Sequence, residues 1–415
     1  KWILRGGYGL YYLGQNESGA TQGFSRASSA ITSTDGNLTP AVNLTNAFSN
    51  LPGGRLLAPI GNSLGAASFL GEGININYLD RKLPASHQYS VDVQHELPGN
   101  LLAEIGYVGN LSRGLPVNTN INVLPAAEMG RRLPTGALDT GYYTAQVTNP
   151  LRGLIPNNAS KNGATIARQE LLLPYPQYGA FNYNSLSIGS QRYDGLQAKL
   201  TKRYSKGVVF NASYSFIKVR EEVSLLRPQD YSYSSPTSTQ LENRSGGQID
   251  IPHKFAIAGV WDLPVGRGQR FAGNSSRLAD LVIGGWQMNF NIAYQSGWTA
   301  DFPNAKPAKD GSAKLDSPNL FTQYFDTSLW NDSTGRRVPA LTNFELRDFP
   351  TRFNDVRVPG YRNVDASLAK YFPIPEKVRM QFRFEMVNAF NRPWFSNFDS
   401  GALDVTSARF GQLDP

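Results

Sequence analysis

Residues 378–386 read Val-Arg-Met-Gln-Phe-Arg-Phe-Glu-Met, a run in which apolar and polar side chains alternate without a break. Successive side chains of a β-strand point to opposite faces of the sheet. The run therefore predicts a strand with one apolar face and one charged face. Such a strand suits a β-sheet that separates lipid from water.

The same alternation recurs in pairs of segments. Four pairs are predicted, at 87–97 with 101–109, at 194–204 with 208–218, at 253–263 with 282–298, and at 362–372 with 378–390. The run Trp2–Tyr12 is a further strand-like segment. Tight turns are expected at Pro98-Gly99-Asn100 and at Ser205-Lys206-Gly207, because these residue types favour short hairpin connections. The chain therefore contains about nine predicted strands.

The segments between the pairs are long and rich in Asn, Ser, Thr, Gly, Pro and Tyr. They lie near 14–86, 110–192, 219–252 and 299–360. Structureless loops of this length are rare in compact soluble domains, whereas outer-membrane barrels combine short turns at one end with long extracellular loops. The strands are also close to the roughly 9–11 residues that cross a bilayer. We therefore expect an all-β fold, a transmembrane antiparallel β-barrel. A soluble multi-domain β-sandwich is the alternative, because alternation alone fits both.

Composition narrows the function classes. Of 415 residues, 17% are charged, and no stretch approaches the roughly 18 consecutive apolar residues of a transmembrane helix, so a membrane interpretation must rely on strands. Cysteine is absent, which excludes disulfides and thiolate metal sites. The net charge of +8 is not concentrated in any basic run, so nucleic-acid binding is not expected.

Catalytic motifs are missing from the sequence. His87, His95 and His253 have no metal-ligand spacing, and neither a His-Glu-x-x-His helix nor a Gly-x-Ser-x-Gly turn occurs. Gly266-Arg267-Gly268 lacks the third glycine of a nucleotide-binding loop and is interpreted as a turn. The expectation is a protein that is not an enzyme and that carries no cofactor and no metal.

The polar sides of the strands carry a row of charged residues. These are Lys199, Arg203, Arg379, Arg383 and Glu385. In a barrel they would line the lumen, where they would pair with one another or with a plug domain. Direct contact with a ligand is the alternative interpretation.

Several motifs, spread in order over nearly the whole chain, resemble those of Oar-like TonB-dependent outer-membrane receptors, common in acidobacteria. They include Arg5-Gly6-Gly7-Tyr8-Gly9-Leu10-Tyr11-Tyr12, Glu104-Ile105-Gly106-Tyr107-Val108-Gly109-Asn110, Pro359-Gly360-Tyr361-Arg362-Asn363-Val364-Asp365 and Phe382-Arg383-Phe384-Glu385-Met386-Val387-Asn388-Ala389-Phe390-Asn391. The resemblance implies a plugged barrel of the roughly 22-stranded kind in the outer membrane of a Gram-negative, acidobacterial cell. Residues 1–415 would be the carboxyl-terminal part of that barrel, and the plug and the amino-terminal regulatory-like domain are not expected in this chain.

The resemblance also implies a function, namely TonB-energised uptake of a bulky solute such as a siderophore, an oligosaccharide or a peptide. The implied partners are outer-membrane lipid, the receptor's own plug and the TonB complex. Aromatic faces stack on sugars and planar ligands, so the candidate loop contacts are Tyr175, Tyr178, Tyr183, Tyr231, Tyr233 and Trp330. Packing of the loops on themselves is the alternative role for each. The alternative functions are a non-transport surface barrel acting in adhesion or assembly, and a soluble β-rich binding protein.

Overall fold

The computed structural model describes residues 1–14, 31–50, 56, 58–59, 61–155, 158–221, 250–347, 349–350, 352–373, 379–395, 398 and 400–413. The chain divides into two compact units. The sheet unit comprises Lys1–Gly14, Lys82–Val117 and Ser187–Pro415, and the loop unit comprises Gln15–Arg81 and Asn118–Leu186.

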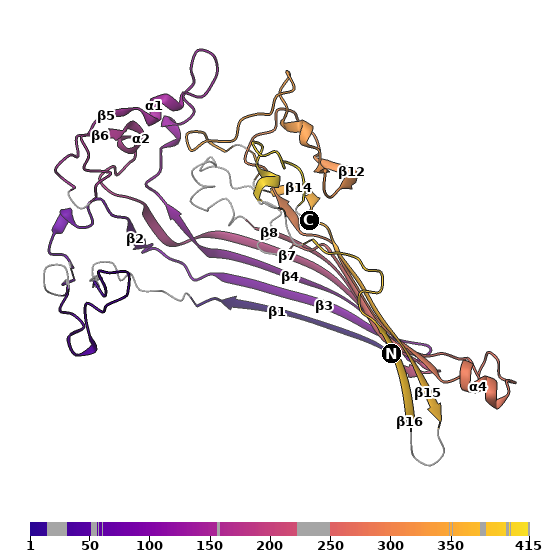
Figure 1. Ribbon diagram of the computed structural model, residues 1–415. Coiled ribbons are helices and arrows are strands. Elements are labelled where there is room, and N and C mark those ends of the chain that lie inside the picture. The colour runs from indigo at the N-terminus through magenta and orange to yellow at the C-terminus, as the bar shows by residue number, and fades with distance from the viewer. Residues whose placement is uncertain are drawn as a thin grey trace. The chain divides into compact units, whose positions relative to one another are not determined.

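Nine long strands form one continuous sheet (Figure 1). In spatial order they are β1 (Trp2–Tyr12), β3 (Ala85–Leu97), β4 (Leu101–Asn120), β7 (Phe181–Ser205), β8 (Val208–Glu221), β9 (His253–Asp262), β10 (Trp286–Gln295), β15 (Tyr361–Pro373) and β16 (Arg379–Met386). All four predicted pairs are present as neighbours in this order. The sheet therefore confirms the all-β, antiparallel prediction. Among the described residues, β1 and β16 each pair on one side only.

The short turns are formed by residues that tolerate positive φ. Lys206 and Gly207 have φ of 51° and 76°, and Gly99 and Asn100 have φ of 81° and 60°. Two consecutive positive φ values match the twist of the flanking strands in a tight hairpin. The predicted turns after residues 97 and 204 are confirmed.

The prediction of a strand over 282–298 is wrong at its start. Residues Arg277–Ile283 form the helix α4, and strand β10 begins only at Trp286. Ser276 accepts a hydrogen bond at its side chain from the Ala279 amide, which caps the helix, and Gly285 has φ of 66° at the junction with the strand. Val282, which alternation assigned to a strand face, is an exposed helical residue.

Two further predicted strand boundaries are wrong. The 378–390 strand ends at Met386, because Asn388 adopts φ of 48° and donates its amide to Asp365 Oδ1 at 2.8 Å. Strands β4 and β7 extend well into 110–120 and 181–193, which the sequence suggested were loop. Alternation in those stretches is interrupted by glycine and polar residues, so it did not mark the strands.

A second folded part of the sheet unit, here called the aromatic lobe, comprises residues 299–358 with 398–413. It contains β11 (Thr299–Asp301), β12 (Lys314–Asn319), β13 (Gln323–Phe325), η6 (Thr327–Trp330), β14 (Arg352–Arg357) and η7 (Ser400–Leu403). Its interior holds Phe325, Trp330, Phe353, Phe410 and Leu413, all nearly inaccessible to solvent. The expectation of an irregular loop over 299–360 is therefore corrected, since this segment encloses its own hydrophobic core.

Tyr324 makes the lobe sensitive to alkaline pH. Its hydroxyl donates to the Arg357 carbonyl oxygen at 2.7 Å, and burial raises the pKa of Tyr324 to about 12. The unfolded phenol titrates near 10, so the stabilisation is complete below about pH 10 and is lost as pH rises through the folded pKa. We expect the lobe to lose hydrogen-exchange protection between about pH 10 and 12. In Tyr324→Phe this pH-dependent step should disappear, and an identical step in the variant would contradict the assignment.

Besides the ends of β4 and β7, the described residues of the loop unit form short elements. They are β2 (Ile74–Asn77), α1 (Thr140–Thr144), β5 (Gln146–Thr148), β6 (Thr165–Ala167), α2 (Arg168–Leu171), η1 (Leu44–Asn46), η3 (Gly65–Ala67) and η4 (Ala126–Glu128). Tyr143, Ile155 and Ile166 are its most buried apolar residues. In the described part of the chain, no helix is long and apolar enough to cross a membrane.

Candidate functional site

The sheet has one face that is apolar and exposed, here called the apolar face. Cross-strand partners share a face, and the pairs Leu4 with Val93, Tyr214 with Phe255 and Leu368 with Phe384 are all apolar. On β16, Met380, Phe382 and Phe384 have exposed fractions of 51%, 59% and 55%. Large apolar side chains this exposed over many adjacent strands require a non-aqueous environment.

The opposite side of the same strands, here called the polar face, carries hydrogen-bonded side chains. Arg5 donates to Gln94, and Gln94 donates to Glu104, which links β1, β3 and β4. Arg5 also lies 3.8 Å from the Asp92 carboxylate. These contacts cross the sheet between strands far apart in sequence.

A second chain of hydrogen bonds on the polar face crosses β9, β10, β15 and β16. Gln287 donates to Asp262 at 2.7 Å, and the Tyr371 hydroxyl donates to Gln287 at 3.3 Å. Gln381 then donates to the Tyr371 hydroxyl at 3.0 Å. The polar face is therefore held by side-chain networks near both edges of the described sheet.

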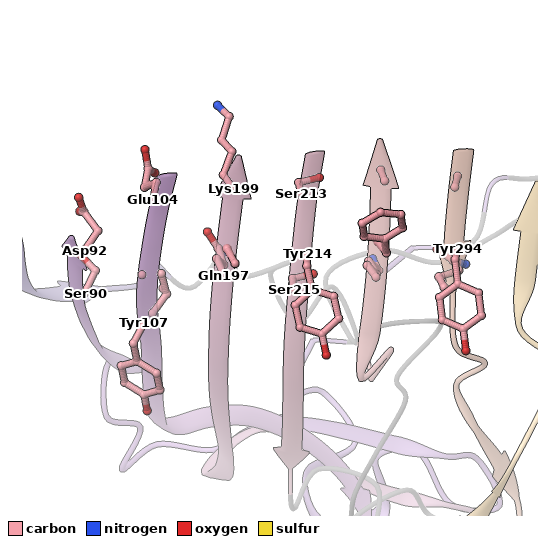
Figure 2. A pocket seen from close by; sticks show the side chains of 18 of the residues that line it. Ser90, Asp92, Glu104, Tyr107, Gln197, Lys199, Ser213, Tyr214, Ser215 and Tyr294 are labelled. Atoms are coloured by element: carbon pink, nitrogen blue, oxygen red, sulfur yellow. The ribbon is translucent and has the colours of Figure 1, made fainter. Parts of the chain in front are cut away.

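Between these networks the polar face is hollowed. The hollow, here called the charged hollow, has a volume of about 620 Å³ and is lined by Asp92, Glu104, Lys199 and Lys254 among others. Figure 2 shows Asp92, Glu104 and Lys199 on the neighbouring strands β3, β4 and β7. Two carboxylates and two ammonium groups line the hollow, so it suits a polar solute or a protein surface of complementary charge. Sequence patterning put Asp92 on the polar side of its strand, but it held no signal that Glu104 and Lys199 would stand beside it.

The predicted row of charged residues lies on the strands as expected. Lys199 and Arg203 are exposed on β7, and neither has an acidic partner among the described residues. Arg383 and Glu385 on β16 pair with each other at 3.3 Å, along the strand rather than across it. Arg379 begins the same strand, opposite Pro373.

Three of the predicted tyrosines come together in the loop unit. Asn122 donates to the carbonyl oxygens of Tyr175 and Tyr178 at 3.0 and 3.4 Å. The Phe181 ring lies 5.2 Å from that of Tyr175 and 6.0 Å from that of Tyr183. Tyr175 remains 40% exposed. Tyr175 and Tyr183 thus form one small aromatic cluster with Phe181, and Tyr178 is held beside it through its carbonyl oxygen.

The prediction that Trp330 contacts a ligand from a loop is wrong. Its side chain has no exposed surface, and its indole N–H donates to the Ala305 carbonyl oxygen at 2.9 Å inside the aromatic lobe. It therefore stabilises the lobe and is not available to a ligand. Tyr231 and Tyr233 lie outside the described residues.

Within the described ranges, His, Asp and Glu side chains form no group that could hold a metal ion.

A family model for the outer membrane beta barrel domain matches residues 1–414. The chain belongs to this family. The barrel domain accounts for the apolar face, which is the surface that an outer-membrane barrel presents to lipid. No curated protein sequence matches the chain.

Several solved structures are similar to the chain at low identity. The outer membrane transporter YddB from Escherichia coli is 9% identical with a TM-score of 0.38, over 96% of this chain and 36% of that one. The ferric citrate transporter FecA in its unliganded form is 13% identical with a TM-score of 0.31, over 77% and 28%. The FrpB iron transporter from Neisseria meningitidis is 10% identical with a TM-score of 0.31, over 77% and 29%. The chain thus spans about a third of the length of these proteins.

A charge on the apolar face of this barrel domain should impair assembly. Phe384→Arg places a guanidinium on the lipid side of β16, and Arg near the bilayer midplane costs about 2–4 kcal/mol. We expect a reduced heat-modifiable fraction of the full-length protein in outer-membrane extracts. Gln197→Arg, at an exposed position on the polar face of β7, is the control. Equal losses in both variants would contradict the assignment of the two faces.

Proposed function

We propose that the chain is the carboxyl-terminal part of an Oar-like TonB-dependent receptor barrel that takes up a bulky solute across the outer membrane. The observation that carries this proposal is the polar face, which follows the same strands as the apolar face. A barrel that faces lipid on its outside and carries polar side chains on its inside has a hydrophilic lumen. Such a lumen suits the passage of a polar solute.

The open edges of the described sheet support the partial-barrel part of the proposal. Unpaired backbone N–H and C=O groups at a sheet edge cost several kcal/mol each in lipid. β1 and β16 each have such an edge among the described residues. Further strands of a longer protein would close the barrel between them, and a plug domain would fill the lumen against Arg5, Asp92 and Lys199.

Ligand contact is proposed for the long segments at the extracellular end. Tyr175, Tyr178 and Tyr183 of the loop unit are the proposed contacts, and Tyr231 and Tyr233 are proposed from sequence alone. The proposed solute is a siderophore, an oligosaccharide or a peptide.

Uptake assays test the proposal. The full-length protein would be expressed in Gram-negative cells with and without TonB, and accumulation of radiolabelled ferric siderophores, oligosaccharides and peptides would be measured. We expect one class to accumulate only in energised cells that contain TonB. Accumulation that is independent of TonB, or absent for every class, would overturn energised uptake.

A second candidate function is attachment of the cell to a surface, and the aromatic lobe favours it. A lobe with its own hydrophobic core presents a stable surface for contact with another surface. Adhesion of expressing cells to coated surfaces, retained without TonB and lost on removal of 299–358, would support this candidate over uptake.

A further inference from the structure

A second hollow of about 690 Å³ lies on the polar face, over β1, β3, β4, β7 and β8. We call it the neutral hollow. By strand alternation the side chains that point into it include Tyr11, Gln88, Ser90, Asn110, Gln191 and Tyr193. None of its lining residues is charged. It therefore differs in chemistry from the charged hollow on the same face.

Two tyrosine rings lie flat along the sheet in this hollow. A Cβ added at Gly9 would lie 2.6 Å from the Tyr11 ring, and one added at Gly195 would lie 2.9 Å from the Tyr193 ring. Each ring thus covers a glycine two residues away on its own strand, and a larger residue there would displace the ring. One face of each ring rests on the backbone, which leaves the other face for the hollow. Tyr11 is 54% exposed.

The polar side chains around the rings have free hydrogen-bonding groups. Asn110 Oδ1 accepts from the hydroxyls of Ser112 at 2.8 Å and Ser86 at 3.2 Å, which orients the amide and leaves its NH₂ group free. Among the described residues, Gln88 and Gln191 have no side-chain hydrogen-bond partner. Amides both donate and accept, so they match hydroxyl groups of a ligand without requiring charge.

Apolar surface completes the site. Val108 supplies aliphatic surface to the hollow, and Val219, opposite Tyr193 in the register and 1% exposed, supports it from beneath. Flat aromatic faces, aliphatic surface and neutral amides together match a sugar ring, which has C–H faces and a rim of hydroxyls. An anionic ferric siderophore would require cationic groups that this hollow lacks.

We propose that the neutral hollow binds an uncharged oligosaccharide, with Tyr11 and Tyr193 as stacking platforms and Gln88, Asn110 and Gln191 as hydroxyl contacts. The proposal rests on the proposed uptake function and gives it a substrate class. Tyr11 and Tyr193 come from strands that are distant in sequence, and the register of the sheet brings them to one hollow.

Calorimetry with the full-length protein in detergent tests this site. The probes are maltohexaose, cellohexaose and xylohexaose, with hexagalacturonate as the acidic counterpart. We expect at least one neutral probe to bind and the acidic one to bind at least about tenfold more weakly. Tyr11→Ala and Tyr193→Ala should each weaken binding about tenfold, the loss expected for a stacked ring. Tyr11→Phe should stay within about twofold, because the ring face is kept.

Gly9→Ala and Gly195→Ala test the geometry of the rings. Both keep the tyrosines but push the rings off the sheet, so each should weaken binding as much as the corresponding tyrosine loss. Tyr12→Ala is the matched control, since Tyr12 follows Tyr11 on β1 but lies on the apolar face and is 63% exposed. Heat-modifiable migration confirms that each variant is folded.

The outcomes separate this proposal from the uptake function. Failure of every neutral probe to bind, preference for the acidic probe, or binding unaffected by all four tyrosine-to-alanine and glycine-to-alanine variants of the hollow would overturn the site. Because calorimetry needs neither TonB nor energy, a protein that binds the sugar without accumulating it contradicts uptake alone. TonB-dependent accumulation of another solute class, with no sugar bound, contradicts the site alone.

Discussion

Replacing Trp330 with alanine is expected to destabilise the aromatic lobe by about 3–5 kcal/mol, the range for a buried tryptophan. The side chain is fully buried, and its ring centroid lies 5.5 Å from that of Phe302 and 5.6 Å from that of Phe410. The substitution leaves a cavity among the surrounding aromatic rings. It also leaves the buried Ala305 carbonyl oxygen without its hydrogen bond.

Hydrogen exchange followed by mass spectrometry over 299–358 measures this effect in the full-length protein. Protection in the lobe should fall sharply while that of β7 and β8 is retained. Trp394→Ala is the matched control, because Trp394 is 46% exposed and its loss should cost less than about 1 kcal/mol. Similar losses of protection in both variants would show that Trp330 is not a core residue.

Asp250→Ala should lower the stability of the lobe by a comparable amount, about 3–5 kcal/mol, because it leaves the Arg357 guanidinium without its carboxylate partner. The Asp250 carboxylate accepts from Arg357 Nη2 at 2.8 Å and from the Thr299 hydroxyl at 3.1 Å. Its other oxygen accepts from the Val219 amide at 3.2 Å. The residue is 1% exposed, so Arg357 would stay partly buried without a carboxylate partner, bonded only to the carbonyl oxygens of residue 250 and Gly297.

A double variant separates the contribution of the ion pair from the effect of truncating each side chain. Asp250→Ala with Arg357→Ala should lose less protection over 299–301 and 352–357 than the sum of the two single variants, because neither charge is then stranded. Asp316→Ala, an exposed acidic residue of β12, should change protection little. Strict additivity of the two single effects would contradict the coupling.

The strands and their two faces were predictable from sequence, with errors at their ends. The alternation at 378–386 identified the apolar face of β16 correctly, because the period of two is a local property of an extended chain. The same rule placed Val282 on a strand, where a capped helix forms instead. Capping by Ser276 depends on a few polar contacts that hydrophobic alternation does not report.

The site was less predictable. Aromatic content suggested that Trp330 contacts a ligand from a loop, whereas distant segments around Phe325, Phe353 and Phe410 bury it. The sequence identified charged residues of the polar face, but it did not show which of them lie close to one another. Their pairing depends on register between strands, and a shift of one residue would reverse every face.

The sequence by itself determined that this chain forms a two-faced antiparallel sheet with tight turns, since alternation and turn chemistry act over a few residues. Only the tertiary structure decided that Tyr11 and Tyr193 line one hollow and that Trp330 is a core residue. Both facts depend on contacts between segments far apart in the chain, which are set by the summed packing and hydrogen bonding of the folded sheet and lobe.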